Sequence, residues 1–135
     1  MCFDYKLQVN MIYKEIKLVP TLFYLDVFIG KTKELPKIFN EYYGASVDYY
    51  KEEITPLQVC TINSTVKSKF KGEIRIVLNV KNFNTPILIH EINHVLWHLH
   101  KLTGIELNYN SQEWSSYFIE NIYNEIIRKD NYIIL

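Results

Sequence analysis

The chain has 135 residues, of which 48% are hydrophobic and 15% aromatic, and its basic and acidic residues balance to a formal net charge of zero. This length suits a single domain over 1–135 with a core of its own, and the apolar content excludes general disorder. A neutral chain offers no basic field on the scale of a domain, so nucleic acid is not expected as a partner.

The cysteines and the apolar pattern bear on the compartment. Cys2 and Cys60 form no disulfide framework, and we expect reduced thiols, which favour a cytoplasmic setting. The first residues lack the basic start and apolar run of a signal peptide. No apolar run reaches the about eighteen residues that cross a membrane, so no membrane partner is expected. Packaging in a virion stays open as an alternative location.

The first third of the chain predicts strands followed by a helix. Apolar and polar residues alternate over 3–9, and 12–19 and 22–29 have the apolar density of two further strands. Apolar residues then recur at helical spacing over 35–43, and Gly44 supplies the stop.

A hairpin follows in the middle of the chain. Its predicted strands are 57–62 and 73–80. In the second strand, Ile74, Ile76, Leu78 and Val80 alternate strictly with Glu73, Arg75, Val77 and Asn79. The connecting loop carries a small group of basic residues that we expect to be solvated, namely Lys67, Lys69 and Lys71.

A helix is predicted over about 86–102. Thr85 suits the N-cap, Pro86 suits the first helical position, and Gly104 follows as a stop. On a helical wheel the apolar residues and the histidines occupy opposite arcs, which separates a core face from a histidine face. The apolar arc comprises Leu88, Ile92, Val95, Leu96, Leu99 and Leu102, and the opposite arc comprises His90, Glu91, His94 and His98.

Residues 90–94 read His-Glu-Ile-Asn-His, which is an HExxH motif. His90 and His94 are four residues apart, so on a helix both imidazoles can reach one metal ion. Two neutral imidazoles suit zinc, and a carboxylate that is not a ligand, here Glu91, can take a proton from zinc-bound water. The alternative is a chance motif with structural histidines, but such histidines are expected on the apolar side of the helix.

A catalytic zinc site usually has three protein ligands and a water, so a third ligand is needed. His100 has the third-ligand spacing of metzincins (HExxHxxGxxH), but Trp97 stands where that pattern requires glycine. On a continuing helix His100 points away from His94, and we reject it as a ligand. His98 lies one turn beyond His94 and is expected at the edge of a cleft.

A second helix is predicted to begin after Asn110 or Ser111, either of which suits the N-cap. Its apolar stripe, Phe118, Ile119, Ile122 and Ile126, is expected to be buried. The other face carries Glu113, Tyr117, Glu120 and Asn124, and Glu113 stands nineteen residues after His94.

HExxH on one helix and a glutamate on the next resembles the gluzincin arrangement of thermolysin-like metallopeptidases. The resemblance implies Glu113 as the third zinc ligand, with Glu120 as the rival two turns further along. That family often carries ExxSD around its glutamate. Here Tyr117 replaces the aspartate, which leaves no residue assigned to orient a zinc-binding histidine. The alternative role for Glu113 is compensation of the helix dipole in the first turn.

The stretch 90–127 also resembles small zincin-like proteins encoded by bacteriophages. The implied fold is α+β and zincin-like, with a mainly antiparallel sheet packed against the HExxH helix and a C-terminal helix. In that fold an extended peptide pairs with a strand near the cleft, here 73–80 or its neighbour at the sheet edge.

The resemblance implies a zinc-dependent metallopeptidase that acts on a peptide or protein, in the host cytoplasm if the chain is phage-encoded. Glu91 would be the general base, and the donor to the oxyanion would come from Tyr109, Tyr117 or His98. The alternative, from another class, is a zincin-fold binding or structural module that acts on host or virion partners with little or no catalysis.

Overall fold

The computed structural model describes residues 11–30, 35–44 and 59–135. The predicted strand over 3–9, Cys2 and the first two residues of the predicted strand 57–62 lie outside these residues, while the other predicted elements are present with ends shifted by at most two residues. The elements in chain order are β1 (Ile12–Lys17), β2 (Tyr24–Ile29), α2 (Leu35–Tyr43), β3 (Val59–Asn63), β4 (Ile74–Val80), α4 (Thr85–Thr103), the short 3-10 helix η2 (Tyr109–Ser111), α5 (Gln112–Ile127) and β5 (Ile133–Ile134).

The strands form one mixed sheet in the order β3-β4-β2-β1-β5. β2 and β4 run parallel, and the remaining neighbours run antiparallel, so the expected α+β class is confirmed. β4 is paired on both sides, with β2 and β3. The expectation that 73–80 itself could accept a peptide strand is therefore wrong, and among the described strands its neighbour β3 is the outermost at this end of the sheet.

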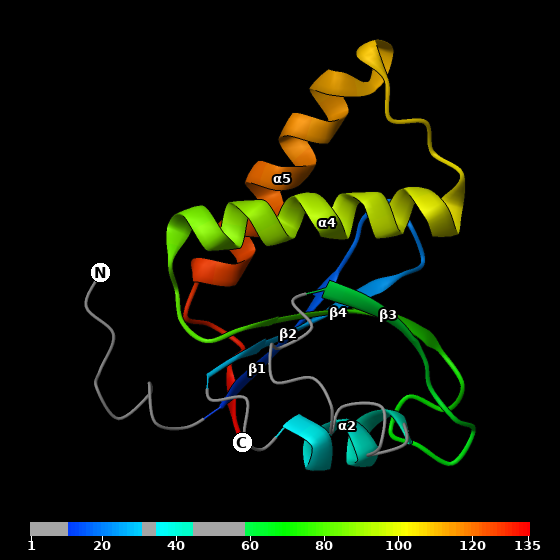
Figure 1. Ribbon diagram of the computed structural model, residues 1–135, viewed down its shortest axis with the longest axis vertical. Helices are drawn as coiled ribbons and strands as arrows, with labels where there is room; N and C mark the ends of the chain where they lie inside the picture. Colours follow the sequence, from blue (N-terminus) through cyan, green and yellow to red (C-terminus); the bar gives the residue numbers. More distant parts are fainter. Residues whose placement is uncertain (1–10, 31–34, 45–58) are drawn as a thin grey trace.

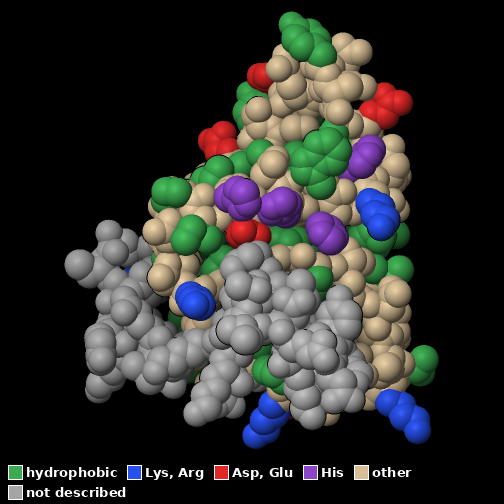
Figure 2. Space-filling view, in the orientation of Figure 1, with side chains coloured by type: hydrophobic (Ala, Val, Ile, Leu, Met, Phe, Trp, Pro, Cys, Tyr) green, Lys and Arg blue, Asp and Glu red, His purple; other side chains and the backbone are tan. Residues whose placement is uncertain are grey.

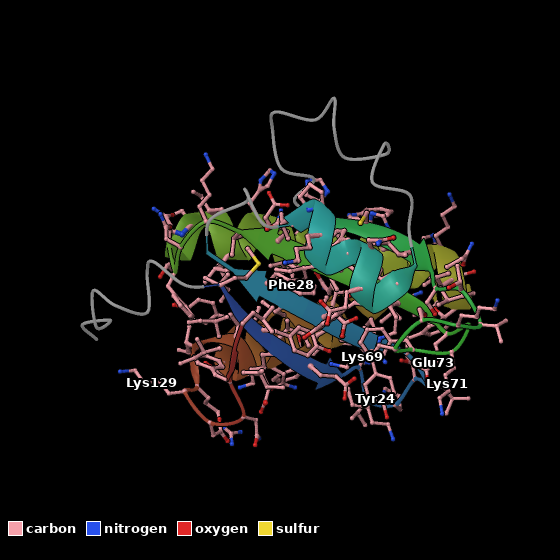
Figure 3. All side chains as sticks on the ribbon, turned by 90° about the horizontal axis from the view of Figure 1, so that it is seen from below. Tyr24, Phe28, Lys69, Lys71, Glu73 and Lys129 are labelled. Atoms are coloured by element: carbon pink, nitrogen blue, oxygen red, sulfur yellow. The ribbon has the colours of Figure 1, made fainter. Side chains whose placement is uncertain are left out.

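Helices cover both faces of the sheet (Figure 1). α4 and α5 pack on one face, where their apolar stripes meet inward residues of β1, β2 and β4. α2 covers the other face, and Figure 3 shows Phe28 beneath it, with its ring 5.3 Å from that of Phe39. The core between the sheet and helices α4 and α5 contains Leu25, Val27, Ile76, Leu78, Leu88, Ile92, Val95, Leu99, Phe118, Ile122 and Ile126. None of the helices in the described residues is long and apolar enough to cross a membrane.

Because α2 covers the second face, the polar residues that alternate along β4 are buried as well. Arg75 is only 2% exposed and binds the fully buried Asp26 of β2 with two hydrogen bonds, of 3.0 Å from Nε and 2.6 Å from Nη2. The hydroxyls of Tyr13 and Tyr43 donate to the same carboxylate at 2.7 and 2.6 Å. This charged pair and its two tyrosines fasten β1, β2, β4 and α2 together.

Cys60 and the loop lysines lie as the sequence analysis predicted. Cys60 is a free, buried thiol, and burial raises its pKa to about 12. Lys67, Lys69 and Lys71 are exposed, as expected for a solvated loop. Lys69 also makes a contact that the sequence did not predict, because its ammonium lies 4.1 Å from the ring centre of Tyr42.

Replacing Arg75 by methionine tests how far the fold depends on the buried pair. Arg75→Met leaves the Asp26 charge buried with two hydroxyl donors only, and we expect a loss of about 3–5 kcal/mol in the free energy of unfolding, measured by urea denaturation. Arg128→Met is the control, because Arg128 also pairs with carboxylates, those of Glu125 and Asp130, but does so in solvent. Equal and small effects of the two substitutions would contradict this account.

Candidate metal centre

Helix α4 begins and ends as the local sequence dictates. The side chain of Asn84 accepts a hydrogen bond from the backbone N–H of Ile87 at 3.1 Å, so the N-cap is Asn84, one residue before the predicted Thr85. Pro86 occupies the first turn, where its missing N–H costs nothing. Gly104 ends the helix with φ of 75°, a left-handed conformation that favours glycine.

The two predicted faces of α4 are confirmed. Leu88, Ile92, Val95, Leu96 and Leu99 are buried against the sheet, and Leu102 is partly buried beside them. Figure 2 shows the histidine side chains gathered along α4 on one face of the molecule. The HExxH histidines therefore belong to the surface of the helix and not to its core face.

His90 and His94 direct their Nε2 atoms toward each other at 3.2 Å. Two nitrogens bound to one tetrahedral zinc at about 2.0–2.1 Å lie about 3.3 Å apart, so this separation fits a shared metal. The contact is a hydrogen bond when one Nε2 carries a proton and the other accepts it, and a shared cation would take the place of that proton.

Glu91 is more buried than the helical wheel predicted. The wheel assigns Glu91 to the arc of the histidines. In the structure the residue is only 6% exposed, because it lies where that arc meets the core face of the helix. Oε1 is 3.9 Å from Nε2 of His90, and Oε2 has no hydrogen-bond partner among the described residues. Burial raises the pKa of Glu91, while His94 and His90 oppose the shift. A buried carboxylate oxygen without a donor fits a water or ion at this place.

The third predicted ligand is not beside the pair. Among the described residues, no group of three His, Cys, Asp or Glu side chains lies close enough together to hold a metal. Glu113 lies exposed in the first turn of α5, and Glu120 lies exposed further along it. The structure thus joins two of the three predicted ligands, and the role of Glu113 stays a prediction.

The start of the α5 region differs from the expected one. Asn108 caps η2, since its Oδ1 accepts from the backbone N–H of Ser111 at 3.1 Å. Ser111 precedes α5 but makes no capping bond with its side chain. Ser111 thus occupies the N-cap position of α5, as predicted, while the capping hydrogen bond is made by Asn108 at the start of the preceding 3-10 turn. The predicted apolar stripe is confirmed, with Phe118, Ile122 and Ile126 buried and Ile119 partly buried.

The predicted oxyanion donors lie at three separate places. Tyr109 is 82% exposed on η2. Tyr117 lines a groove between α5 and the end of β1, and neither His90 nor His94 lines that groove. His98 is half-buried, and its Nδ1 lies 2.7 Å from the hydroxyl of Thr61 in β3. Of the three, His98 alone lies on the helix that carries the HExxH pair.

His100, which the sequence analysis rejected as a ligand, contacts the chain at the end of α4. Its Nδ1 bonds the carbonyl of Ile105, and its ring meets Trp97 edge to face with centres 5.7 Å apart. Thr61 is the residue that sequence reasoning missed. Thr61 lies in a predicted strand, but the sequence did not indicate that this strand, β3, would lie beside α4.

No family model, curated protein or solved structure matches this chain.

Zinc affinity tests the pairing of His90 and His94. We expect His90→Ala and His94→Ala each to weaken zinc binding by more than about 100-fold, because each removes one of few ligands. Competition with a chromophoric chelator measures the affinity. His100→Ala is the control and should leave it unchanged, since His100 points away from His94 on the helix and its ring packs against Trp97. A similar loss in all three variants would disprove the assignment.

Proposed function

We propose that the chain is a zinc-dependent metallopeptidase with a zincin-like fold, acting on a peptide or protein in the cytoplasm. The observation that carries the proposal is the 3.2 Å approach of two Nε2 atoms beside a buried carboxylate oxygen that lacks a donor among the described residues. The arrangement of α4, which follows β4 and packs beside β3, supports the proposed fold.

In this proposal His90 and His94 hold zinc through Nε2, and Glu113 is the third ligand. When bound, zinc polarises the scissile carbonyl and lowers the pKa of a bound water. Glu91 accepts the proton of the attacking water on its carboxylate and passes it to the leaving amine. The 3.9 Å separation of Glu91 Oε1 from Nε2 of His90 supports this role, because the carboxylate lies beside a nitrogen that would hold zinc.

The second candidate function is a binding or structural module with the same fold. It is favoured by the lack of a third metal-binding side chain beside His90 and His94 in the described residues. Loss of catalysis would make Glu91 dispensable, because a carboxylate that is not a ligand contributes to proton transfer alone. The two functions therefore differ in what the substitution of Glu91 does.

The third ligand is tested by a pair of substitutions on α5. Glu113→Ala is expected to weaken zinc affinity by about 10-fold or more, and Glu120→Ala to do much less. Both residues are exposed on the same helix, so the two variants should fold equally well. Loss of metal from the Glu120 variant alone would move the third ligand two turns along α5.

Glu91→Gln separates the peptidase from the binding module. The substitution keeps the size of the side chain and removes its basicity, so zinc content and melting temperature should stay nearly unchanged. Cleavage of a peptide library should fall by about 10²–10⁴-fold, the usual effect of losing a general base. A wild type that cleaves nothing, together with a Glu91→Gln variant that keeps the biological phenotype, would favour the module.

A further inference from the structure

The loop between β3 and β4 places the ammonium of Lys69 among three aromatic rings. Its Nζ lies 4.1 Å from the ring centre of Tyr42 on α2, 5.1 Å from that of Tyr13 on β1 and 5.5 Å from that of Phe70. The ring of Tyr42 is nearly perpendicular to the other two, at 89° to Tyr13 and 79° to Phe70. These three rings form an aromatic cage, the arrangement that recognises methylated ammonium ions.

The rings of the aromatic cage are held by the core, whereas Lys69 is not. Tyr13, Tyr42 and Phe70 are at most 8% exposed and belong to the core beneath α2, while Lys69 is exposed. The guanidinium of Arg75 lies 3.9 Å from the ring centre of Phe70 and helps to hold that ring. A cation–π contact at an exposed site changes an equilibrium by only about 2–5-fold, and a lysine held there loses side-chain freedom. The ammonium can therefore leave the cage while the rings keep their places.

The charges around the aromatic cage favour a cation. The hydroxyl of Tyr13 donates to the carboxylate of Asp26 at 2.7 Å, which increases the negative charge on the ring that faces the cage. Asp26, Glu15 and Glu73 carry three negative charges, against the one positive charge of Arg75 that they bind. A cation that enters the cage is therefore attracted by the rings and by the carboxylates behind and beside them.

A small cleft opens beside the aromatic cage. It has a volume of about 200 Å³, and its lining includes Lys69, Phe70, Glu73 and Tyr24. Figure 3 shows Tyr24, Lys69 and Glu73 close together at one end of the sheet. Pockets that enclose a whole small molecule have about 300–1,000 Å³, so this cleft suits one head group with the rest of the ligand in solvent.

We propose that the aromatic cage binds a methylated ammonium ion, and that Lys69 is an internal occupant that gives way to it. The ammonium of lysine is compact and strongly hydrated, so it loses more on leaving water than a methylated ammonium does. The incoming ion therefore gains more from the same rings. A free cation such as choline and a trimethylated lysine side chain present the same head group. The site lies on the face of the sheet opposite α4, and it does not depend on the proposed peptidase function.

Proton NMR titration of the 135-residue chain tests the cage with three ligands. These are choline, its uncharged isostere 3,3-dimethylbutan-1-ol, and a short peptide that contains trimethylated lysine. We expect the charged ligands to bind about 5–30-fold more tightly than the isostere, because only they have a cation–π attraction. Their methyl signals should move upfield above the ring faces, and the ε-methylene signal of Lys69 should move toward that of a solvated lysine. The tighter of the two charged ligands distinguishes a free cation from a methylated protein as the source.

Two pairs of variants assign the binding to the aromatic cage. Lys69→Ala empties the cage and should tighten choline binding about 2–5-fold. Lys67→Ala removes the same charge from the same loop and should not. Tyr42→Leu removes the nearest ring and should abolish the preference for choline over the isostere, whereas Tyr42→Phe keeps the ring and should retain it.

Several results would overturn the inference. One is equal binding of choline and its isostere, and another is no binding of either charged ligand to the wild type and to Lys69→Ala. A folded Tyr42→Leu variant with an undiminished preference for choline, or a Lys69→Ala variant that binds no more tightly than Lys67→Ala, would do the same. If Tyr42→Leu does not fold, the comparison of choline with its isostere on the wild type decides.

Discussion

The burial of one face of α4 determines where every residue of the candidate centre lies. Leu88, Ile92 and Leu99 are at most 1% exposed, and each fully buried side chain of this kind contributes about 1.5–3 kcal/mol. A rotation of the helix would expose these residues and bury imidazoles in their place. The helix is therefore held in one orientation, with His90 and His94 in solvent and Glu91 at the border.

The sheet beneath α4 can hold the helix in this orientation because buried polar contacts on the opposite face of the sheet join its strands. An arginine in the interior of a sheet is tolerated only when its charge is paired and its donors are satisfied. The carboxylate of Asp26 pairs with Arg75 and accepts two hydrogen bonds from its guanidinium. The hydroxyls of Tyr13 and Tyr43 donate to the same carboxylate. The pair joins the two central strands, β2 and β4. A short segment, 81–84, joins β4 to α4, so this contact also holds the strand from which the HExxH helix follows.

Local periodicity predicted α4 and its two faces, because a helix repeats every 3.6 residues whatever it packs against. It could not predict the parallel pairing of β2 with β4 or the Asp26–Arg75 contact, which join residues far apart in the chain. The burial of Glu91 was missed for a similar reason, since a helical wheel gives the direction of a side chain but not how far the rest of the fold covers it. Thr61 lay in a predicted strand, and only the sheet order brought it to His98.

The central claim is that two imidazoles of α4 bind zinc, and X-ray absorption at the zinc K-edge of the reconstituted protein tests it most directly. We predict one zinc per chain with nitrogen and oxygen neighbours at about 2.0–2.2 Å, two of them from imidazole rings and none from sulfur. The imidazole signature should disappear in the His90→Ala/His94→Ala double variant. A protein that retains no zinc, or one whose zinc has sulfur neighbours at about 2.3 Å, would contradict the account.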